Sequence, residues 1–428
     1  MHPDVSAHRP AGISTVATES LRWVTAAGVP AEGGLTWPET RLPGARRTDD
    51  LYDGTAGVLA ALAQARLAGC TEFDDFAAAA AGRLAALAPD TVTDPGLYTG
   101  LAGMAAALRM WFLTSGDRGA LDAAQAMVRA LAWRVSRTAE AGQPVSPWRD
   151  IMAGEAGILL VLVRAGDGDG TSDDDVLAAA AAVADSLVAQ ATWTDGSPDW
   201  HPRADFPVFH PNFSHGLAGI GFALAASAGP LGRPDLLELA VLAGQRLVSL
   251  GQRPDGTLAV PHQFPPEGPE PALCYGWCHG PAGTLRLFEL LVRLRPGQGW
   301  ELQAEAARRA VRRSGLPARL HPGFWDNLGQ CCGTAGVGEM ALDRYQATGD
   351  ASWLGWAAEL AADVLARQTA DPDGVRWSHT EHRVTPPELE PGTGFMQGAA
   401  GIAAWLLRLD LVSREGPGAP VPWWPDRP

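Results

Sequence analysis

Three cysteines stand where a chain could bind a metal ion. Cys278 precedes a His-Gly pair, and Cys331 and Cys332 are adjacent and precede a glycine. Thiolates suit a thiophilic ion such as Zn²⁺, and three protein ligands leave the fourth tetrahedral position open, as in catalytic zinc sites. The spacing matches no zinc finger or ribbon. The elements that position these cysteines therefore decide whether they form one site.

A Gly-x-x-Gly unit followed by an apolar run occurs seven times. The first glycines are Gly54, Gly100, Gly154, Gly216, Gly280, Gly333 and Gly398. Each interval has room for an apolar helix, a loop and a more amphipathic helix, such as the one in residues 233–250. Buried helices paired with half-exposed ones predict an all-α fold, an α/α toroid of seven helical hairpins. We expect residues 1–428 to form a single domain of this kind.

The polar residues share one register within these repeats. The two positions before the first glycine hold Ser214 and His215, then Cys278 and His279, then Cys331 and Cys332, in three consecutive repeats. Equivalent positions of a toroid lie at one end of the ring, so these side chains should converge. We also expect exposed first-turn amides there, suited to an anion or polar ligand. In repeats 1, 2 and 7 the glycines are interpreted as packing motifs only.

Other cysteine chemistry stays open at this point. The cysteines could be buried free thiols or form a disulfide, including a vicinal one between Cys331 and Cys332. Cys70 and Cys274 fall outside the register and are interpreted as non-ligands.

Composition excludes several functions. The net charge is −15, which argues against nucleic acid and anionic membranes as partners. The sequence contains no lysine, which excludes pyridoxal-phosphate enzymes and P-loop nucleotide-binding proteins, because both require one. Residues 1–43 show no signal-peptide pattern, and no apolar run is long enough to span a bilayer. We therefore expect a cytoplasmic protein without membrane insertion.

Four motifs resemble those of the LanC-like lanthionine cyclases over essentially the whole chain. They are HGLAG at 215–219, WCHGPAG at 277–283, CCGTAG at 331–336 and GFMQGAAGI at 394–402. The resemblance implies a zinc ion held by Cys278, Cys331 and Cys332, although most of the family has His at the last position. It also implies His215 as a candidate acid/base residue and Asp150 as its catalytic aspartate.

The resemblance predicts a thioether cyclase. A cysteine thiol of a dehydrated precursor peptide would add to dehydroalanine or dehydrobutyrine, with His215 as first and His279 as second choice of proton donor. Asp150 would orient His215 or the peptide, or cap a helix. A separate dehydratase would supply the substrate. Many bacterial members carry an Arg shortly before the W-C pair, and this chain does not. Either another arginine takes its role, with Arg149 as a candidate, or the role is absent.

Three rival functions remain. The chain could add glutathione or another free thiol to dehydrated residues. It could be a glycosidase or epimerase, which would need two carboxylates at the site, and Asp53 and Asp150 are the candidates. It could also be a non-enzymatic peptide-binding or partner-binding module. The remaining loop histidines are interpreted as surface or loop residues: His201, His210, His262, His321, His379 and His382. Of these, His201 and His210 precede repeat 4 and could line the substrate opening.

Overall fold

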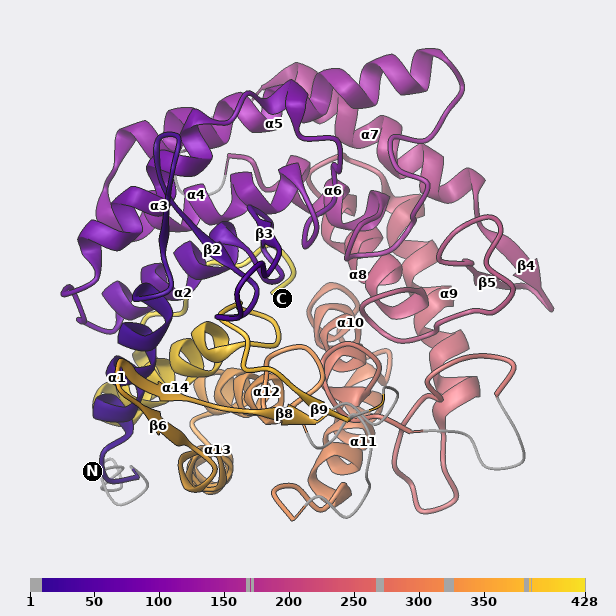
Figure 1. The fold of residues 1–428 in the computed structure, drawn as a ribbon. Helices are drawn as coiled ribbons and strands as arrows, with labels where there is room; N and C mark the ends of the chain where they lie inside the picture. Colours follow the sequence, from indigo (N-terminus) through magenta and orange to yellow (C-terminus); the bar gives the residue numbers. More distant parts are fainter. Residues whose placement is uncertain are drawn as a thin grey trace. The chain divides into compact units, whose positions relative to one another are not determined.

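The computed structural model describes residues 10–166, 170, 173–266, 273–318, 327–380, 385 and 387–427. Fourteen α-helices and several short strands lie within these residues (Figure 1). The chain divides into two compact units, and each is described by itself. Unit 1 comprises Met1–Leu87, Ala107–Leu121 and Ser314–Trp423, and unit 2 comprises Ala88–Ala106, Asp122–Arg313 and Trp424–Pro428. Helices α4 (Leu101–Ser115) and α5 (Arg118–Glu140) supply residues to both.

Unit 1 is built from three helix pairs. Its helices are α1 (Ile13–Thr25), α2 (Thr55–Leu67), α3 (Asp74–Ala86), α12 (Thr334–Thr348), α13 (Ala351–Ala366) and α14 (Ala399–Glu415). Helix α2 packs on α3 and α12 on α13, as consecutive hairpins. The third pair joins the two ends of the chain, because α14 packs on α1 (Figure 1). The seventh Gly-x-x-Gly helix therefore takes its partner from the N-terminal segment.

Unit 2 contains three consecutive hairpins. They are α6 (Glu155–Val163) with α7 (Asp174–Ala189), α8 (Leu217–Ala228) with α9 (Pro234–Gly251), and α10 (Pro281–Leu294) with α11 (Trp300–Arg313). The first helices of these hairpins are neighbours, since α8 contacts both α6 and α10. Within unit 2, the glycine of each of these repeats thus opens a helix that lies beside the equivalent helix of a neighbouring repeat.

Burial separates the two kinds of helix, as the sequence predicted. Every residue of α8 is buried except Ala226. Its partner α9 buries one stripe, including Leu236, Ala240 and Leu247, and exposes the opposite face. An apolar stripe at helical spacing covers the inner helix, whereas an all-apolar helix must be covered on every side. The inner helices therefore form the cores of the two units.

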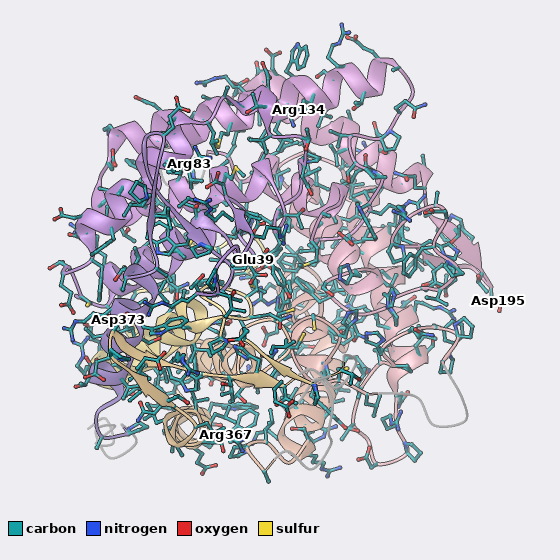
Figure 2. The ribbon with its side chains drawn as sticks, viewed as in Figure 1. Glu39, Arg83, Arg134, Asp195, Arg367 and Asp373 are labelled. Carbon is teal, nitrogen blue, oxygen red and sulfur yellow. The ribbon has the colours of Figure 1, made fainter. Side chains whose placement is uncertain are left out.

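Short antiparallel ribbons follow several outer helices. They are β1 (Val29–Ala31) with β2 (Gly34–Pro38), β4 (Thr192–Thr194) with β5 (Ser197–Asp199), and β6 (Thr369–Asp371) with β7 (Gly374–Arg376). Three smaller strands are β3 (Arg47–Thr48), which pairs with β2, and β8 (His379–Thr380) with β9 (Glu388–Leu389). The β4–β5 turn uses Asp195 and Gly196, both at positive φ, and Asp195 lies at the ribbon tip (Figure 2).

A buried tryptophan ties each of these ribbons to the outer helix before it. The indole N–H donates to a helix carbonyl thirteen residues earlier in the chain. The three pairs are Trp37 with Val24, Trp200 with Leu187 and Trp377 with Val364. Each bond gives the indole N–H an acceptor at the end of the helix, where the carbonyls lack the N–H partners of the helix interior.

Candidate functional site

The loop before each inner helix turns back on the helix that it precedes. The N–H of Glu155 donates to the carbonyl of Trp148, seven residues earlier, at 3.1 Å. The same return joins Ala218 to Pro211, Thr334 to Asn327 and Ala399 to Gly392. The prediction of exposed first-turn amides was wrong at these helices, because backbone carbonyls already accept their hydrogen bonds. Side chains, rather than helix amides, must therefore supply any binding chemistry.

The returning loop explains the first glycine of each repeat. A Cβ atom on Gly216 would lie 1.6 Å from the carbonyl oxygen of His210, and one on Gly333 would lie 2.3 Å from that of Asn327. The backbone passes so close to the Cα atom that any larger residue would displace the loop. The two residues before each glycine are consequently held at the same end of their inner helix.

Cys331 and Cys332 lie side by side in unit 1, in the loop just before α12. Both thiols are buried, and their Sγ atoms are 3.4 Å apart. A disulfide would require about 2.05 Å, so the vicinal disulfide considered above is not formed. Two thiolates on a tetrahedral zinc ion with ~2.3 Å bonds would be ~3.8 Å apart, which is close to the observed separation. The pair fits two ligands of such an ion.

Repeats 1 and 7 surround this pair with polar groups. The phenol of Tyr52 accepts a hydrogen bond from Gln397 Nε2 at 2.8 Å, and Asn327 Nδ2 donates to Gln397 Oε1 at 3.0 Å. Burial raises the pKa of Tyr52 well above its usual range, and the neighbouring thiols of Cys331 and Cys332 raise it further. Tyr52 therefore stays a neutral phenol at physiological pH. The interpretation of repeats 1 and 7 as packing motifs only was incomplete.

Asp53 follows Tyr52 in the same register. Burial, reinforced by the nearby carboxylates of Asp50 and Glu39, raises the pKa of Asp53 to about 7. Asp50 itself accepts bonds from the backbone amides of Asp53 and Gly54, at 2.9 and 3.2 Å. A carboxyl group with a pKa near neutral pH is a feature of many functional sites. The sequence indicated Asp53 only as a candidate glycosidase carboxylate.

Cys278 belongs to unit 2, where aromatic and charged residues fix its loop. Its carbonyl accepts the Ser214 N–H at 3.0 Å, and the thiol is buried. The preceding Trp277 packs against Tyr98, with ring centroids 5.1 Å apart. Tyr98 in turn donates to the buried carboxylate of Asp426 at 2.8 Å. Asp426, near the end of the chain, thus supports the W-C motif through Tyr98.

His215 and Asp150 form a hydrogen-bonded pair in unit 2. His215 Nδ1 lies 2.8 Å from Asp150 Oδ2, and the carboxylate is fully buried while the imidazole is 35% exposed. The other carboxylate oxygen accepts the N–H of Ala153 at 2.9 Å. Asp150 thus accepts a backbone N–H in the turn before α6 and also orients His215. The two roles considered for it are therefore compatible. An imidazole oriented through Nδ1 in this way can exchange a proton through Nε2.

Arg149, the candidate replacement for the missing arginine, is held by other groups. Its guanidinium donates to Gln190 Oε1 at 2.7 Å and to the carbonyl of His201 at 2.8 Å. Desolvation lowers the pKa of Arg149, and the charge of Glu155 counteracts part of that effect. These bonds fix the guanidinium against the end of α7 and the loop that follows β5.

Four histidines gather in unit 2, and the repeat register predicts two of them, His215 and His279. The ring of His279 lies 5.5 Å from that of His215, 5.4 Å from His210 and 4.1 Å from His262. His210 and His262 were predicted to be loop or surface residues; both are in loops but only partly exposed. His201 stacks on Phe209. His379 is buried, and His321 and His382 lie outside the described residues.

The comparisons with known proteins agree with these features. The sequence profile described as lanthionine synthetase C-like protein matches residues 46–415. This chain belongs to the lanthionine synthetase C-like family. All seven Gly-x-x-Gly units of the LanC-like chain fall within the matched residues. No protein of curated function matches the sequence.

Solved structures confirm the predicted fold class. A structure titled Nisin cyclase matches with a TM-score of 0.64 and 15% identity, covering 93% of both chains. The Lin0763 protein from Listeria innocua matches at 0.53 with 12% identity, covering 93% of this chain and 97% of that one. An alpha-1,6-mannanase from Salegentibacter sp. matches at 0.52 with 10% identity, covering 94% and 99%. At such identities the likeness establishes the fold alone.

No helix among the described residues combines the length and the apolar character that crossing a membrane requires.

Proposed function

We propose that this LanC-like chain is a zinc-dependent thioether cyclase acting on a dehydrated peptide. The observation that carries the proposal is the buried, reduced Cys331–Cys332 pair, which lies within the residues that match the lanthionine synthetase C-like family. The likeness to the structure titled Nisin cyclase extends over 93% of the chain and supports the fold that this proposal requires.

Three thiolates are the proposed zinc ligands: Cys278, Cys331 and Cys332. Repeat register and the family motifs select Cys278 as the third ligand, and its burial suits a thiolate that is neutralised by a cation. When bound, the ion supplies the positive charge that keeps a substrate cysteine as a thiolate near neutral pH. This chain has Cys332 where most of the family has His, so its ligand set carries more negative charge.

The chain's own residues would manage the proton. The substrate thiolate forms a carbon–sulfur bond to the β-carbon of dehydroalanine or dehydrobutyrine, and the electron pair of the double bond moves toward the α-carbon and its carbonyl. That carbon then needs a proton. The Nε2 atom of His215 is the proposed donor, and Asp150 stabilises the imidazolium before transfer and holds the ring afterwards. His279 is the alternative donor.

The proposal has consequences for partners and location. A dehydrated precursor peptide implies a separate dehydratase, such as a kinase–lyase, acting earlier in the same pathway. Buried thiols that must stay reduced suit a cytoplasmic enzyme. We propose that residues 1–428 act as one LanC-like domain, because the repeats that supply the site residues span nearly all of the chain.

The test incubates the purified chain with a dehydrated peptide and counts the thiols that remain free. We expect thiols to disappear without a change in peptide mass, because cyclisation is an isomerisation. A second arm adds glutathione to a peptide lacking cysteine; a mass gain of one glutathione would favour the free-thiol alternative. Cys278→Ala is the control for zinc dependence. Equal cyclisation by this variant would refute the proposed ligand set, and neither reaction in the wild type would favour a binding module.

A further inference from the structure

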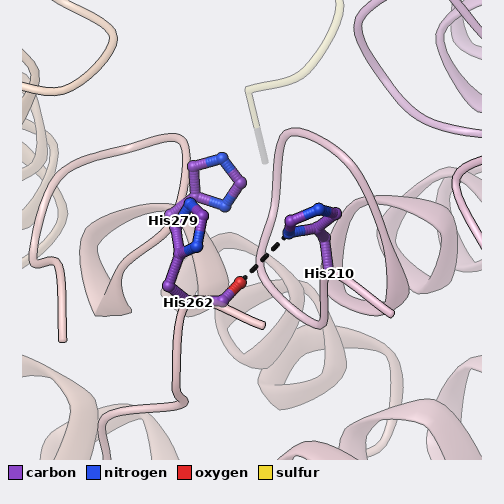
Figure 3. A group of neighbouring side chains, drawn as sticks. All are labelled: His210, His262 and His279. Carbon is purple, nitrogen blue, oxygen red and sulfur yellow. Dashed lines mark hydrogen bonds between the residues drawn. The ribbon is translucent and has the colours of Figure 1, made fainter. Parts of the chain in front are cut away.

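Three histidines from three different loops of unit 2 point toward one another. They are His210, before α8, His262, in the long loop after α9, and His279, before α10 (Figure 3). One ring nitrogen from each lies within 4.8 Å of those of the other two. Three protonated imidazoles would repel one another at this distance. The cluster therefore suits either neutral rings or rings that share a cation.

Backbone hydrogen bonds hold the first two loops in register. Phe209 and Phe264 exchange N–H···O=C bonds of 2.9 and 2.8 Å, next to His210 and two residues beyond His262. This is a short two-stranded contact between otherwise irregular segments. The His210 and His262 side chains are consequently positioned before any ligand arrives, which lowers the entropy that binding would have to overcome.

Further bonds tie these loops to the third one. Asn212 Nδ2 donates to the carbonyl of Pro261 at 2.8 Å, and its Oδ1 accepts from Thr284 in α10 at 3.1 Å. The Ser214 N–H donates to the carbonyl of Cys278, the residue before His279, at 3.0 Å. Hydrogen bonds thus connect the three loops that carry His210, His262 and His279.

The chemical state of His210 also suits a ligand. Its Nδ1 lies 3.3 Å from the carbonyl oxygen of His262, which accepts the Nδ1 proton and leaves the Nε2 lone pair for another partner (Figure 3). A carbonyl that fixes the tautomer in this way is the usual support of a metal-binding histidine. Burial lowers the pKa of His210, so the ring is neutral at physiological pH, as coordination requires.

We propose that His210, His262 and His279 bind a second divalent transition-metal ion, distinct from the ion proposed for the cysteines. Three imidazole nitrogens suit zinc and its neighbours, with a fourth position open to water or to a substrate oxygen. The inference goes beyond the proposed cyclase reaction, because it needs no thiolate and assigns His210 and His262, which that reaction does not use. Coordination of His279 would also remove it as a proton donor and leave that role to His215.

Metal stoichiometry tests the proposal on the full chain. Metal-free protein is titrated with Zn²⁺ alone, and bound zinc is measured after removal of excess. We expect the wild type to bind two equivalents, His262→Ala to lose one, and Cys331→Ser/Cys332→Ser to lose the other. His201→Ala is the matched control, because His201 stacks on Phe209 outside the trio, and it should keep both.

Co²⁺ substitution separates the two sites by their donors. Only the cysteine site gives sulfur-to-cobalt charge-transfer absorption, so His262→Ala should keep that band and lose visible ligand-field intensity. The double cysteine variant should show the reverse. His262→Asp, which supplies a carboxylate ligand, should restore the second equivalent and guards against misfolding of the alanine variant. Equal zinc uptake and identical cobalt spectra for wild type and His262→Ala would overturn the histidine site, whatever the result at the cysteines.

Discussion

Replacing Asp150 with Asn tests the hydrogen-bonded pair of His215 and Asp150, which we propose takes part in proton transfer. The amide keeps the volume of the carboxylate and can still accept the Ala153 N–H through Oδ1. It removes the negative charge 2.8 Å from His215 Nδ1. The fold should survive, whereas the imidazolium should lose its stabilising partner.

The size of the effect follows from burial. Asp150 is 0% exposed, so its charge is poorly screened by water. A hydrogen bond to a charged group contributes about 1.5–3 kcal/mol. With about 1.4 kcal/mol for each factor of ten, the cyclisation rate should fall roughly 10- to 150-fold. His215→Ala, which removes the donor itself, should cost more, roughly 10²- to 10⁴-fold.

The assay is the rate of thiol loss from a dehydrated peptide as a function of pH, with zinc content and thermal unfolding measured on the same samples. The alkaline limb of the profile should move to lower pH in Asp150→Asn. Asp199→Asn is the matched control, because Asp199 is also buried and its carboxylate pairs with Arg246 at 3.1 Å. A folded, zinc-loaded Asp150→Asn with the wild-type rate and pH profile would refute the proton-transfer role.

Three further predictions concern stability. Asp426→Ala leaves the Arg286 guanidinium without its buried carboxylate and should lower the free energy of unfolding by about 3–5 kcal/mol, measured with urea. Burial lowers the pKa of His379 from 6.5 to about 4, so the unfolded chain binds a proton at a higher pH than the folded chain does. About 3 kcal/mol of the stability present above pH 6.5 is therefore lost by pH 4. Urea unfolding of His379→Leu should not show that loss. Gly216→Ala should melt well below Gly229→Ala, because only the first Cβ meets a carbonyl oxygen.

The repeated hairpins could be predicted because the same backbone constraint recurs at each one. A loop that returns against its own helix admits only glycine, and the buried helix that follows must be apolar on all faces. Both constraints leave a local signature in the sequence. The pairing of α14 with α1 leaves none, since it joins two helices that are far apart in the sequence.

The site was only partly visible in the sequence for a related reason. Cys278, His215 and the Cys331–Cys332 pair share a register and carry side chains with recognisable chemistry. Tyr52 shares the same register, yet a phenol is not a common zinc ligand, so its repeat was interpreted as packing.

His210 and His262 lie outside that register altogether. The contact between Phe209 and Phe264 brings them together, and no periodicity predicts such a pairing between two irregular loops. Sequence patterns thus identify residues at fixed positions of the repeats. They do not identify residues that are brought together by contacts between irregular loops.

Tyr52 gives a way to test whether the surroundings of the cysteine pair tune metal binding. Its hydroxyl oxygen already accepts a hydrogen bond from Gln397 at 2.8 Å, which leaves its own proton for the thiol of Cys331, the side-chain partner that helps raise its pKa. A donor to a ligating thiolate stabilises and orients that ligand, and loss of such a partner weakens metal affinity roughly 10- to 100-fold. We expect Tyr52→Phe to show this loss in a competition with a zinc chelator.

The control for Tyr52→Phe is Tyr345→Phe. Tyr345 is a buried phenol in the last turn of α12, whereas Cys331 and Cys332 precede the first turn of that helix, so this variant should keep its zinc affinity. Zinc affinity in Tyr52→Phe equal to that of the wild type would mean that the hydroxyl does not support the thiolate. The raised pKa of Tyr52 would then reflect burial alone, and the polar residues of repeats 1 and 7 would serve the packing role that the sequence first indicated.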